Sequence, residues 1–466
     1  MKKKYKKSIL ISTLIGLATL ATVIIIVFGN AKSTSNAAKK AVEYSYNPAD
    51  IINEETGMLI TLPSDWPRWR GVNIDGLVRD TNLNLDWANQ KPALSYVFRY
   101  CGAGYSGPAI AGTTLYMSGA AEGQDFAFAL DTKTGRLKWQ QNLGEHFVQS
   151  YGDGPRGTIT IDEDKLYLVR GGGCIHCLSA VDGEMVWQRD FLADFGGRLM
   201  GFWGYSESPL VDGNLVICTP GGRTGTIVAL NKNTGATVWT SKEWKDNASY
   251  ASPIVAVVDG VRQYIQQSNN GVAGVRAEDG KLLWSVKVPG YKTAVIPTPV
   301  YKDNIVYVTA GYNAGCAGIL LTKNGDLFHT TIIYNNKNMV NHHGGVVLVD
   351  EHIYGFSDAS GWICQDFRTG DVVWSTGRVK RKDTIGKGAI LAVNDRLLLL
   401  EEQSGLMVVI AASPKGWKEY GRMELPERTA IISNNNMVWA HPVIANGNLY
   451  IRDQDLLFSF DLKPYF

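Results

Sequence analysis

One short motif recurs along this chain and limits what the chain can fold into. In its clearest copy a polar turn ends in Gly, and Trp follows four residues later: Ala129-Leu130-Asp131-Thr132-Lys133-Thr134-Gly135-Arg136-Leu137-Lys138-Trp139. Two weaker copies place His329 and Tyr420 at the Trp position. Successive glycines of the seven copies are 48, 52, 45, 45, 45 and 46 residues apart. A near-constant period in the forties predicts repeated supersecondary units. The tryptophans of the clear copies, which we interpret as structural, are Trp139, Trp187, Trp239, Trp284 and Trp374.

Each unit has the pattern of four short strands. In the first unit, apolar stretches at 108–111, 114–117 and 126–130 precede the Trp-bearing stretch 137–140. The Gly of the motif supplies the positive φ of a tight turn, and the Trp gives the sheet a wide surface for packing. Four antiparallel strands with this period are typical of a β-propeller blade.

The two ends of the repeat region predict the number of blades. The last unit contains two clear strands, 448–451 and 457–461, and the chain stops at Phe466 before a fourth. The strand 94–100 precedes the first full unit and has no blade of its own. Pairing it with the last unit would remove two exposed sheet edges. We therefore predict an all-β, eight-bladed propeller of four-stranded antiparallel blades, closed by an N-terminal strand.

The N-terminus predicts one helix ahead of this domain. Five lysines precede residues 9–28, which carry no charge and are long enough to span a bilayer. The positive-inside rule then places the domain outside the cytoplasm, in the cell envelope (periplasmic). We favour an uncleaved anchor, so that the membrane is a partner through this helix; the alternative is a signal peptide cleaved near Ala31, which would release a secreted protein. The expected domains are the anchor or signal (1–31), a polar linker (32–61) and the propeller (62–466).

Composition excludes several classes of function. The 46 basic and 44 acidic residues are nearly balanced, and no basic patch suggests nucleic acid as a partner. The six cysteines include Cys174 and Cys177, which have neither a second pair nearby for zinc nor a following His for haem attachment. We expect no metal site from this pattern, and most cysteines to be small buried residues.

The stretch 129–139 resembles the tryptophan-docking motif of the pyrroloquinoline quinone (PQQ)-like β-propeller repeat family. The resemblance covers most of residues 62–466. Three further stretches, 65–71 (Asp-Trp-Pro-Arg-Trp-Arg-Gly), 341–345 (Asn-His-His-Gly-Gly) and 439–442 (Trp-Ala-His-Pro), are similar to a bacterial branch with membrane-anchored or secreted members. The family includes quinoprotein dehydrogenases and outer-membrane assembly scaffolds, so the resemblance implies a fold more firmly than a function.

A candidate binding site follows from the position of the first strand of each unit. First strands line the central channel of a propeller, and a Gly/Pro/Ser turn precedes each one. Beside these turns lie polar and aromatic residues that converge on the channel mouth, the usual composition of a ligand site. The predicted ring comprises Tyr105, Arg156, Glu207, Tyr250, His342, His343, Lys387, Trp439 and His441. A solvated channel mouth is the alternative interpretation, and a separate candidate is the stretch 452–454 (Arg-Asp-Gln) in the last blade.

Two functions of different class remain open. The first is a membrane-tethered scaffold outside the cytoplasm that binds an envelope protein or a small ligand. The second is a PQQ-dependent dehydrogenase of alcohols or sugars, in which Arg156 and Lys387 would bind the cofactor's carboxylates and Ca²⁺ would accompany it. The chain lacks the two adjacent cysteines that quinoprotein dehydrogenases carry over the cofactor. The sequence therefore favours the scaffold, identifies no catalytic residue and establishes no cofactor.

Overall fold

The computed structural model describes residues 51, 59, 61–288, 290–377, 384–432 and 436–464. The predicted anchor, residues 9–28, lies outside these residues, as does most of the predicted linker. Within the part that is described, no helix is long and apolar enough to cross a membrane. The propeller belongs to a compact unit that spans Asn47–Phe466, and Ile51 and Leu59 of the expected linker are buried.

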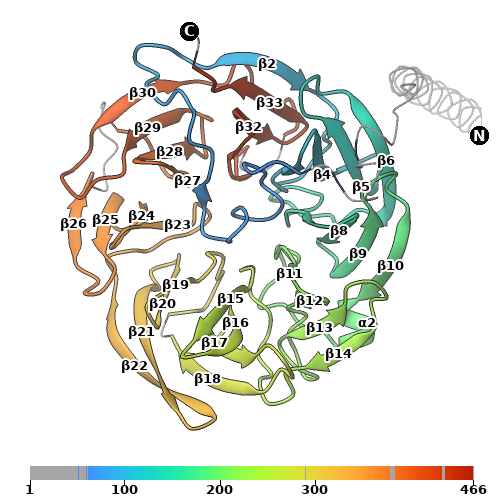
Figure 1. Cartoon of the computed structure of the whole chain (residues 1–466), viewed down its shortest axis with the longest axis vertical. Coiled ribbons are helices and arrows are strands. Elements are labelled where there is room, and N and C mark those ends of the chain that lie inside the picture. The colour runs from blue at the N-terminus through green and yellow to red at the C-terminus, as the bar shows by residue number, and fades with distance from the viewer. Residues whose placement is uncertain are drawn as a thin grey trace, which may run out of the picture. The chain divides into compact units, whose positions relative to one another are not determined.

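Eight antiparallel sheets, one per blade, form a ring in the described part of the chain (Figure 1). The eight-bladed, all-β fold expected from the repeats is confirmed. Blade 1 comprises β3 (Ala109–Ala111), β4 (Thr114–Ala121), β5 (Gln124–Asp131) and β6 (Leu137–Glu145), and blade 2 comprises β7 (Thr160–Asp162), β8 (Lys165–Val169), β9 (Cys174–Ser179) and β10 (Met185–Asp190). Blade 3 comprises β11 (Leu210–Asp212), β12 (Leu215–Cys218), β13 (Val228–Asn231) and β14 (Thr237–Thr240), and blade 4 comprises β15 (Ile254–Val258), β16 (Val261–Gln267), β17 (Gly271–Arg276) and β18 (Leu282–Lys287).

The other four blades complete the ring and receive two strands from the N-terminal region. The short helix α2 (Phe191–Phe195), capped by Asp190, lies between blades 2 and 3. Blade 5 comprises β19 (Val300–Lys302), β20 (Ile305–Ala310), β21 (Gly315–Asn324) and β22 (Leu327–Asn336), and blade 6 comprises β23 (Val346–Val349), β24 (His352–Ser357), β25 (Gly361–Asp366) and β26 (Val372–Ser375). Blade 7 comprises β27 (Gly388–Val393), β28 (Arg396–Glu401), β29 (Met407–Ala411) and β30 (Glu419–Met423), with β1 (Leu77–Val78) parallel to β27. Blade 8 comprises β31 (Val443–Ala445), β32 (Asn448–Asp453), β33 (Leu456–Asp461) and β2 (Ala93–Phe98).

The ring closes as the sequence predicts. Strand β2 pairs antiparallel with β33, from Ala93 opposite Asp461 to Phe98 opposite Leu457. Tyr96 of this strand packs against Gly135 of blade 1, where an added Cβ would lie 2.5 Å from the Tyr ring. The N-terminal strand therefore supplies both the missing edge of blade 8 and the aromatic residue that contacts the next blade.

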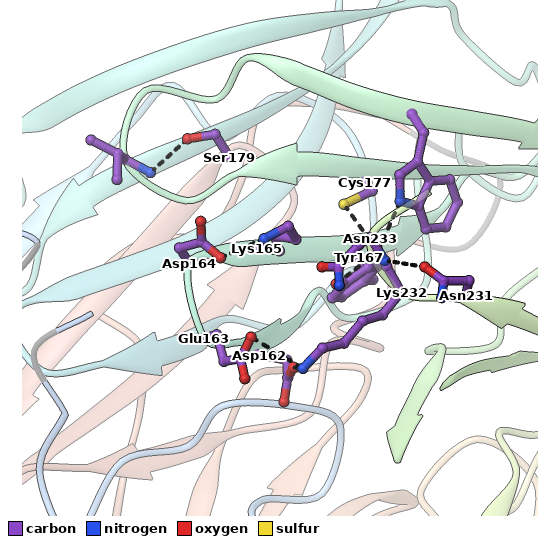
Figure 2. A network of polar contacts seen from close by, with 12 residues as sticks. Asp162, Glu163, Asp164, Lys165, Tyr167, Cys177, Ser179, Asn231, Lys232 and Asn233 are labelled. Atoms are coloured by element: carbon purple, nitrogen blue, oxygen red, sulfur yellow. Dashed lines mark hydrogen bonds and ion pairs between the residues drawn. The ribbon is translucent and has the colours of Figure 1, made fainter. Parts of the chain in front are cut away.

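Most of the repeat tryptophans connect one blade to the next. The indole N–H of Trp187 donates to the Lys232 carbonyl at 2.9 Å, and Trp139, Trp239 and Trp374 donate to carbonyls of the following blade in the same way. Lys232 also binds Asp162 and Glu163 of blade 2 through its ammonium group, so that one residue holds two blades together (Figure 2). Trp284 is the exception, because its N–H donates to Gln263 Oε1 within its own blade at 2.7 Å.

Blade 5 departs from the expected register. Its outer hairpin, β21 and β22, has ten residues in each strand, and His329 on it is exposed, so the equivalence of His329 with the tryptophans is wrong. Tyr334 fills the docking position instead: its hydroxyl donates to the Phe367 carbonyl at 2.7 Å, and its ring occupies the space beside Gly370. The long hairpin moves the turn Gly away from the blade interface, which the spacing alone does not reveal.

Candidate functional site

One end of the central channel is closed by the segment 65–78, which we call the plug. Trp66 forms backbone hydrogen bonds with Ile110 of blade 1 in both directions, at 3.1 and 2.8 Å. Arg68 donates to the Val211 carbonyl of blade 3, and β1 at the end of the plug pairs with β27 of blade 7. The plug, which contains the stretch 65–71, therefore crosses the channel and contacts first strands of several blades.

Trp69 and Arg70 of the plug form the floor of a cavity in the part of the channel that the plug leaves open. The Trp69 N–H donates to Thr298 Oγ1 at 2.8 Å. The Arg70 guanidinium donates to the carbonyls of Asp75 and Val346 at 2.9 and 2.5 Å, and burial lowers its pKa to about 10. Both side chains also line a cavity of about 260 Å³ that lies at the starts of the first strands.

This cavity brings together seven of the nine residues of the predicted ring. Other lining residues that the sequence did not single out include Tyr151, Trp203 and Tyr312, which lie in loops between strands. Their signal was weak, because an aromatic residue in a loop has no periodicity that distinguishes a site from a surface. The predicted residues that line the cavity are Tyr105, Arg156, Tyr250, His342, His343, Trp439 and His441.

Three histidines form one wall. The rings of His342 and His343 have centroids 3.6 Å apart, and His343 lies 4.4 Å from the Trp439 ring. His441 packs against Trp69 at 4.6 Å, and its Nε2 contacts the His343 carbonyl at 2.8 Å. That nitrogen must carry the proton, since a carbonyl only accepts.

Burial keeps these histidines neutral. It lowers the pKa of His342 to about 3 and that of His441 to about 4, and it holds the pKa of His343 well below 6.5. Nearby positive charge, from Lys387 in the case of His342, acts in the same direction. The wall is thus a set of neutral hydrogen-bonding and stacking groups at physiological pH.

Lys387 lies behind this wall rather than on the cavity surface. Its Nζ is 2.9 Å from His342 Nδ1 and 2.8 Å from Asp358 Oδ1. His342 Nε2, the other ring nitrogen, is buried and has no hydrogen-bond partner in the described part of the chain. A bound ligand or water could satisfy this nitrogen, because buried polar groups are normally paired.

Glu207, the acid of the predicted ring, does not line the cavity. It is 2% exposed, and its Oε1 accepts a hydrogen bond from the Thr219 backbone N–H at 2.7 Å. Its Oε2 has no partner among the described residues, and burial raises the pKa of Glu207 to about 7. The carboxyl group therefore titrates close to neutral pH inside blade 3.

The opposite wall holds a cation. The Arg156 guanidinium donates to the carbonyls of Gly152 and Gly154 at 2.7 and 2.6 Å and lies over the Phe147 ring. Tyr105 donates from its hydroxyl to the Tyr151 carbonyl at 2.6 Å, which fixes the loop that carries Arg156. These contacts hold the cationic side of the cavity in one arrangement.

The separate candidate at residues 452–454 has a structural role. Arg452 is 1% exposed and donates to backbone carbonyls of Gly102, Ser106 and Ser118 at 3.0, 2.9 and 2.8 Å. Asp453 accepts from Arg428 at 2.6 Å. The stretch joins blade 8 to blade 1 and lies outside the cavity lining. Asp453 Oδ1 and Gln454 Nε2 are buried without a partner among the described residues.

The cavity does not fit a PQQ–Ca²⁺ site. Calcium takes six to eight oxygen ligands and is usually bound by carboxylates. None of the described residues that line the cavity is Asp or Glu, and Glu207, the acid of the predicted ring, is buried outside the lining. No group of three His, Cys, Asp or Glu side chains in the described ranges could hold a metal ion.

With this geometry established, comparison with known proteins gives the family. The profile described as "Outer membrane protein assembly factor BamB" matches residues 127–376, more than half of the chain. The chain belongs to this family. The Yersinia pestis protein of that name is 26% identical over 257 residues, which cover 53% of this chain and 61% of the relative. The Shewanella oneidensis protein is 19% identical over 362 residues, 72% of this chain and 79% of the relative.

Solved structures agree on the fold and differ in function. The crystal structure of BamB from Moraxella catarrhalis aligns with a TM-score of 0.56 at 15% identity, over 80% of this chain and 98% of that one. Quinohemoprotein alcohol dehydrogenase from Comamonas testosteroni aligns with a TM-score of 0.59 at 12% identity, over 86% and 81%. At such identities the likeness shows a shared propeller fold and nothing about activity.

Proposed function

We propose that this protein is a membrane-tethered β-propeller outside the cytoplasm that acts as a protein-binding scaffold of the cell envelope. The observation that carries the proposal is the family match over 127–376, which spans blades of an intact ring. The relatives of this family that the match identifies are named for assembly of outer membrane proteins. The tether is the apolar N-terminal segment, residues 9–28.

The geometry of the channel mouth suits a binding role. The plug closes one end of the channel, so that a cavity open at the other end remains, and the blades hold its walls in place. Concave surfaces that combine aromatic walls with a few polar groups are the usual form of a binding site. The loops around the mouth are available to a partner, while the opposite end is occupied by the protein's own plug.

Photo-crosslinking in cells tests the scaffold. A photoreactive residue at Phe202, which is exposed beside the mouth, should crosslink the full-length chain to an envelope protein that mass spectrometry identifies. The same residue at Lys133 is the matched control, since it lies in the β5–β6 turn at the opposite ends of the strands. Equal crosslinking from both positions, or none from Phe202, would count against a partner at the mouth.

The dehydrogenase alternative has its own assay. The purified full-length protein is incubated with PQQ and Ca²⁺ and then given alcohols or sugars with an artificial electron acceptor. The scaffold proposal expects neither saturable PQQ binding nor turnover above the protein-free control. Tight PQQ binding with turnover would overturn it.

A further inference from the structure

Two arginines at the cavity, Arg70 and Arg156, form no contact ion pair among the described residues, although Asp75 lies near the first and Asp153 near the second. Arg70, in the floor, is 5% exposed and donates hydrogen bonds to the backbone carbonyls of Asp75 and Val346. Arg156, in the wall, does the same with Gly152 and Gly154. Neither forms an ion pair with any carboxylate of the described residues, whereas Lys387 nearby is paired with Asp358. Carbonyl groups satisfy the N–H donors of these guanidinium groups but carry no charge, so a carboxylate of a ligand would be attracted to this side of the cavity.

The remaining lining has a matching apolar character. Trp69, Tyr105, Tyr250 and Trp439 present rings to the cavity, and no described lining residue is acidic. An aromatic group can stack on such walls, while a cationic group would be repelled by both arginines. The cavity is therefore complementary to an aromatic group that lies beside a carboxylate.

Exposed aromatic residues continue from the cavity onto the surface. Tyr151, Phe202 and Tyr312, which we call the aromatic rim, are 40%, 68% and 50% exposed. Tyr151 and Tyr312 also line the cavity, and Phe202 packs on the lining residue Trp203 with ring centroids 4.6 Å apart. Exposed apolar patches mark protein contacts as well as ligand grooves, and this one extends beyond the cavity onto the surface, past the area that a small molecule inside it would cover.

We propose that the channel mouth binds an acidic, aromatic segment of a partner protein, with an aromatic side chain inserted into the cavity and a neighbouring carboxylate placed against Arg70 and Arg156. The proposal rests on the scaffold function and names the chemistry of its partner. Arg156 binds the carboxylate, Trp439 and Tyr105 stack on the ring, and the aromatic rim covers the adjoining residues of the segment. His342 Nε2 is available for a hydrogen bond to the inserted chain.

Two blocked pentapeptides test this chemistry. Both are acetylated and amidated; one has the composition Gly-Glu-Phe-Glu-Gly and the other Gly-Gln-Phe-Gln-Gly. Binding to the full-length protein is followed by the fluorescence of the lining tryptophans and by calorimetry. We expect the acidic peptide to bind about tenfold or more tightly than the neutral one, since one charge-assisted hydrogen bond corresponds to about that factor.

Variants separate the cavity from general electrostatics. Arg156→Gln should abolish the preference for the acidic peptide, Arg156→Lys should restore most of it, and Lys133→Gln, which removes a charge at the opposite ends of the strands, should leave it unchanged. Thermal melts establish that each variant is folded. A preference that persists in a folded Arg156→Gln protein would overturn the proposal.

Two further outcomes would also overturn it. Equal affinity for the two peptides would remove the carboxylate from the recognition. N-acetylphenylalanine binding as tightly as the acidic pentapeptide would assign the cavity to a free small acid rather than to a protein segment. If crosslinking from Phe202 succeeds while the peptides fail, only this recognition chemistry is wrong; if crosslinking fails as well, the scaffold function is wrong with it.

Discussion

The two ends of the central channel differ in how their buried polar groups are hydrogen-bonded. At the plugged end, Asp65 accepts hydrogen bonds from the backbone N–H groups of Leu62 and Gly112 and from Asn446 Nδ2, all at 2.7 to 3.0 Å. At the mouth, the buried Nε2 of His342 has no partner within the described residues. The plugged end is thus held together around Asp65, although Arg68 Nε of the plug is also buried without a partner in the described residues. Since native proteins pair nearly all buried polar groups, the unpaired nitrogen of His342 on the cavity wall is the group that a ligand could satisfy.

The largest expected effect comes from removing the N-terminal elements that close the ring. A protein that begins at Gly102 lacks the plug, β1 and β2, so blade 8 loses its outer strand and β33 is left as an exposed edge. We expect aggregation and no cooperative melt, because unpaired strand edges are costly and associate. Size-exclusion chromatography and thermal melts test this. A control that begins at Asn47 should remain folded, and an unchanged Tm for the Gly102 protein would contradict the closure.

A matched pair of arginines tests the contrast directly. Arg70→Gln removes the donor to the carbonyls of Asp75 and Val346, and each buried carbonyl left unpaired costs about 1–3 kcal/mol, so we expect a loss of about 2–5 kcal/mol. Arg156→Gln releases the carbonyls of Gly152 and Gly154 at the edge of the cavity, where water can replace the guanidinium, and should cost about 1 kcal/mol. Urea unfolding measures both. Equal losses would mean that the mouth is as tightly integrated as the plugged end.

Glu207 should make stability fall as pH rises. Burial raises its pKa to about 7, so the folded protein keeps a proton that the unfolded chain releases above pH ~4.5. The retained proton of Glu207 adds about 3 kcal/mol to the free energy of unfolding below pH ~4.5, and this stabilisation is lost as the pH rises towards 7. Urea melts between pH 4.5 and 8 should show this decline in the wild type and a smaller one in Glu207→Gln. Parallel curves would place the Glu207 pKa at its ordinary value.

His441 should give a smaller effect of opposite sign. Burial lowers the pKa of His441 to about 4, so between pH ~6.5 and 4 the unfolded chain binds a proton on this residue and the folded protein does not. Stability is lost as pH falls from about 6.5 towards 4, by about 2 kcal/mol, less than the Glu207 term because His441 adjoins a cavity that water can enter. Acid titration followed by tryptophan fluorescence should show a shallower decline in His441→Gln. An identical acid midpoint would exclude His441 as a source of acid sensitivity.

Local signals of the sequence were sufficient for the blades and for most of the cavity. The Gly-x-x-x-Trp period predicted eight blades, and the turn before each first strand identified Tyr105, Arg156, His342 and His441 as neighbours in space. Both inferences rest on repetition, since an equivalent position in every blade must lie at an equivalent place around the axis. Glu207 and Lys387 occupy the same kind of position but do not line the cavity. Glu207 accepts from the Thr219 N–H inside blade 3, and Lys387 binds Asp358 behind His342, because side-chain direction depends on the local packing.

The sequence by itself determined the number of blades, the strand that closes the ring and the end of the channel where polar groups converge. Only the tertiary structure decided that Trp69 and Arg70 form the cavity floor, because Arg70 meets Val346 across 276 residues and no local pattern links the two. It also decided that Tyr334, rather than His329, docks blade 5, since the length of one hairpin shifts the register there. Periodic features follow from spacing; contacts between a unique segment and the repeats depend on packing that spacing does not encode.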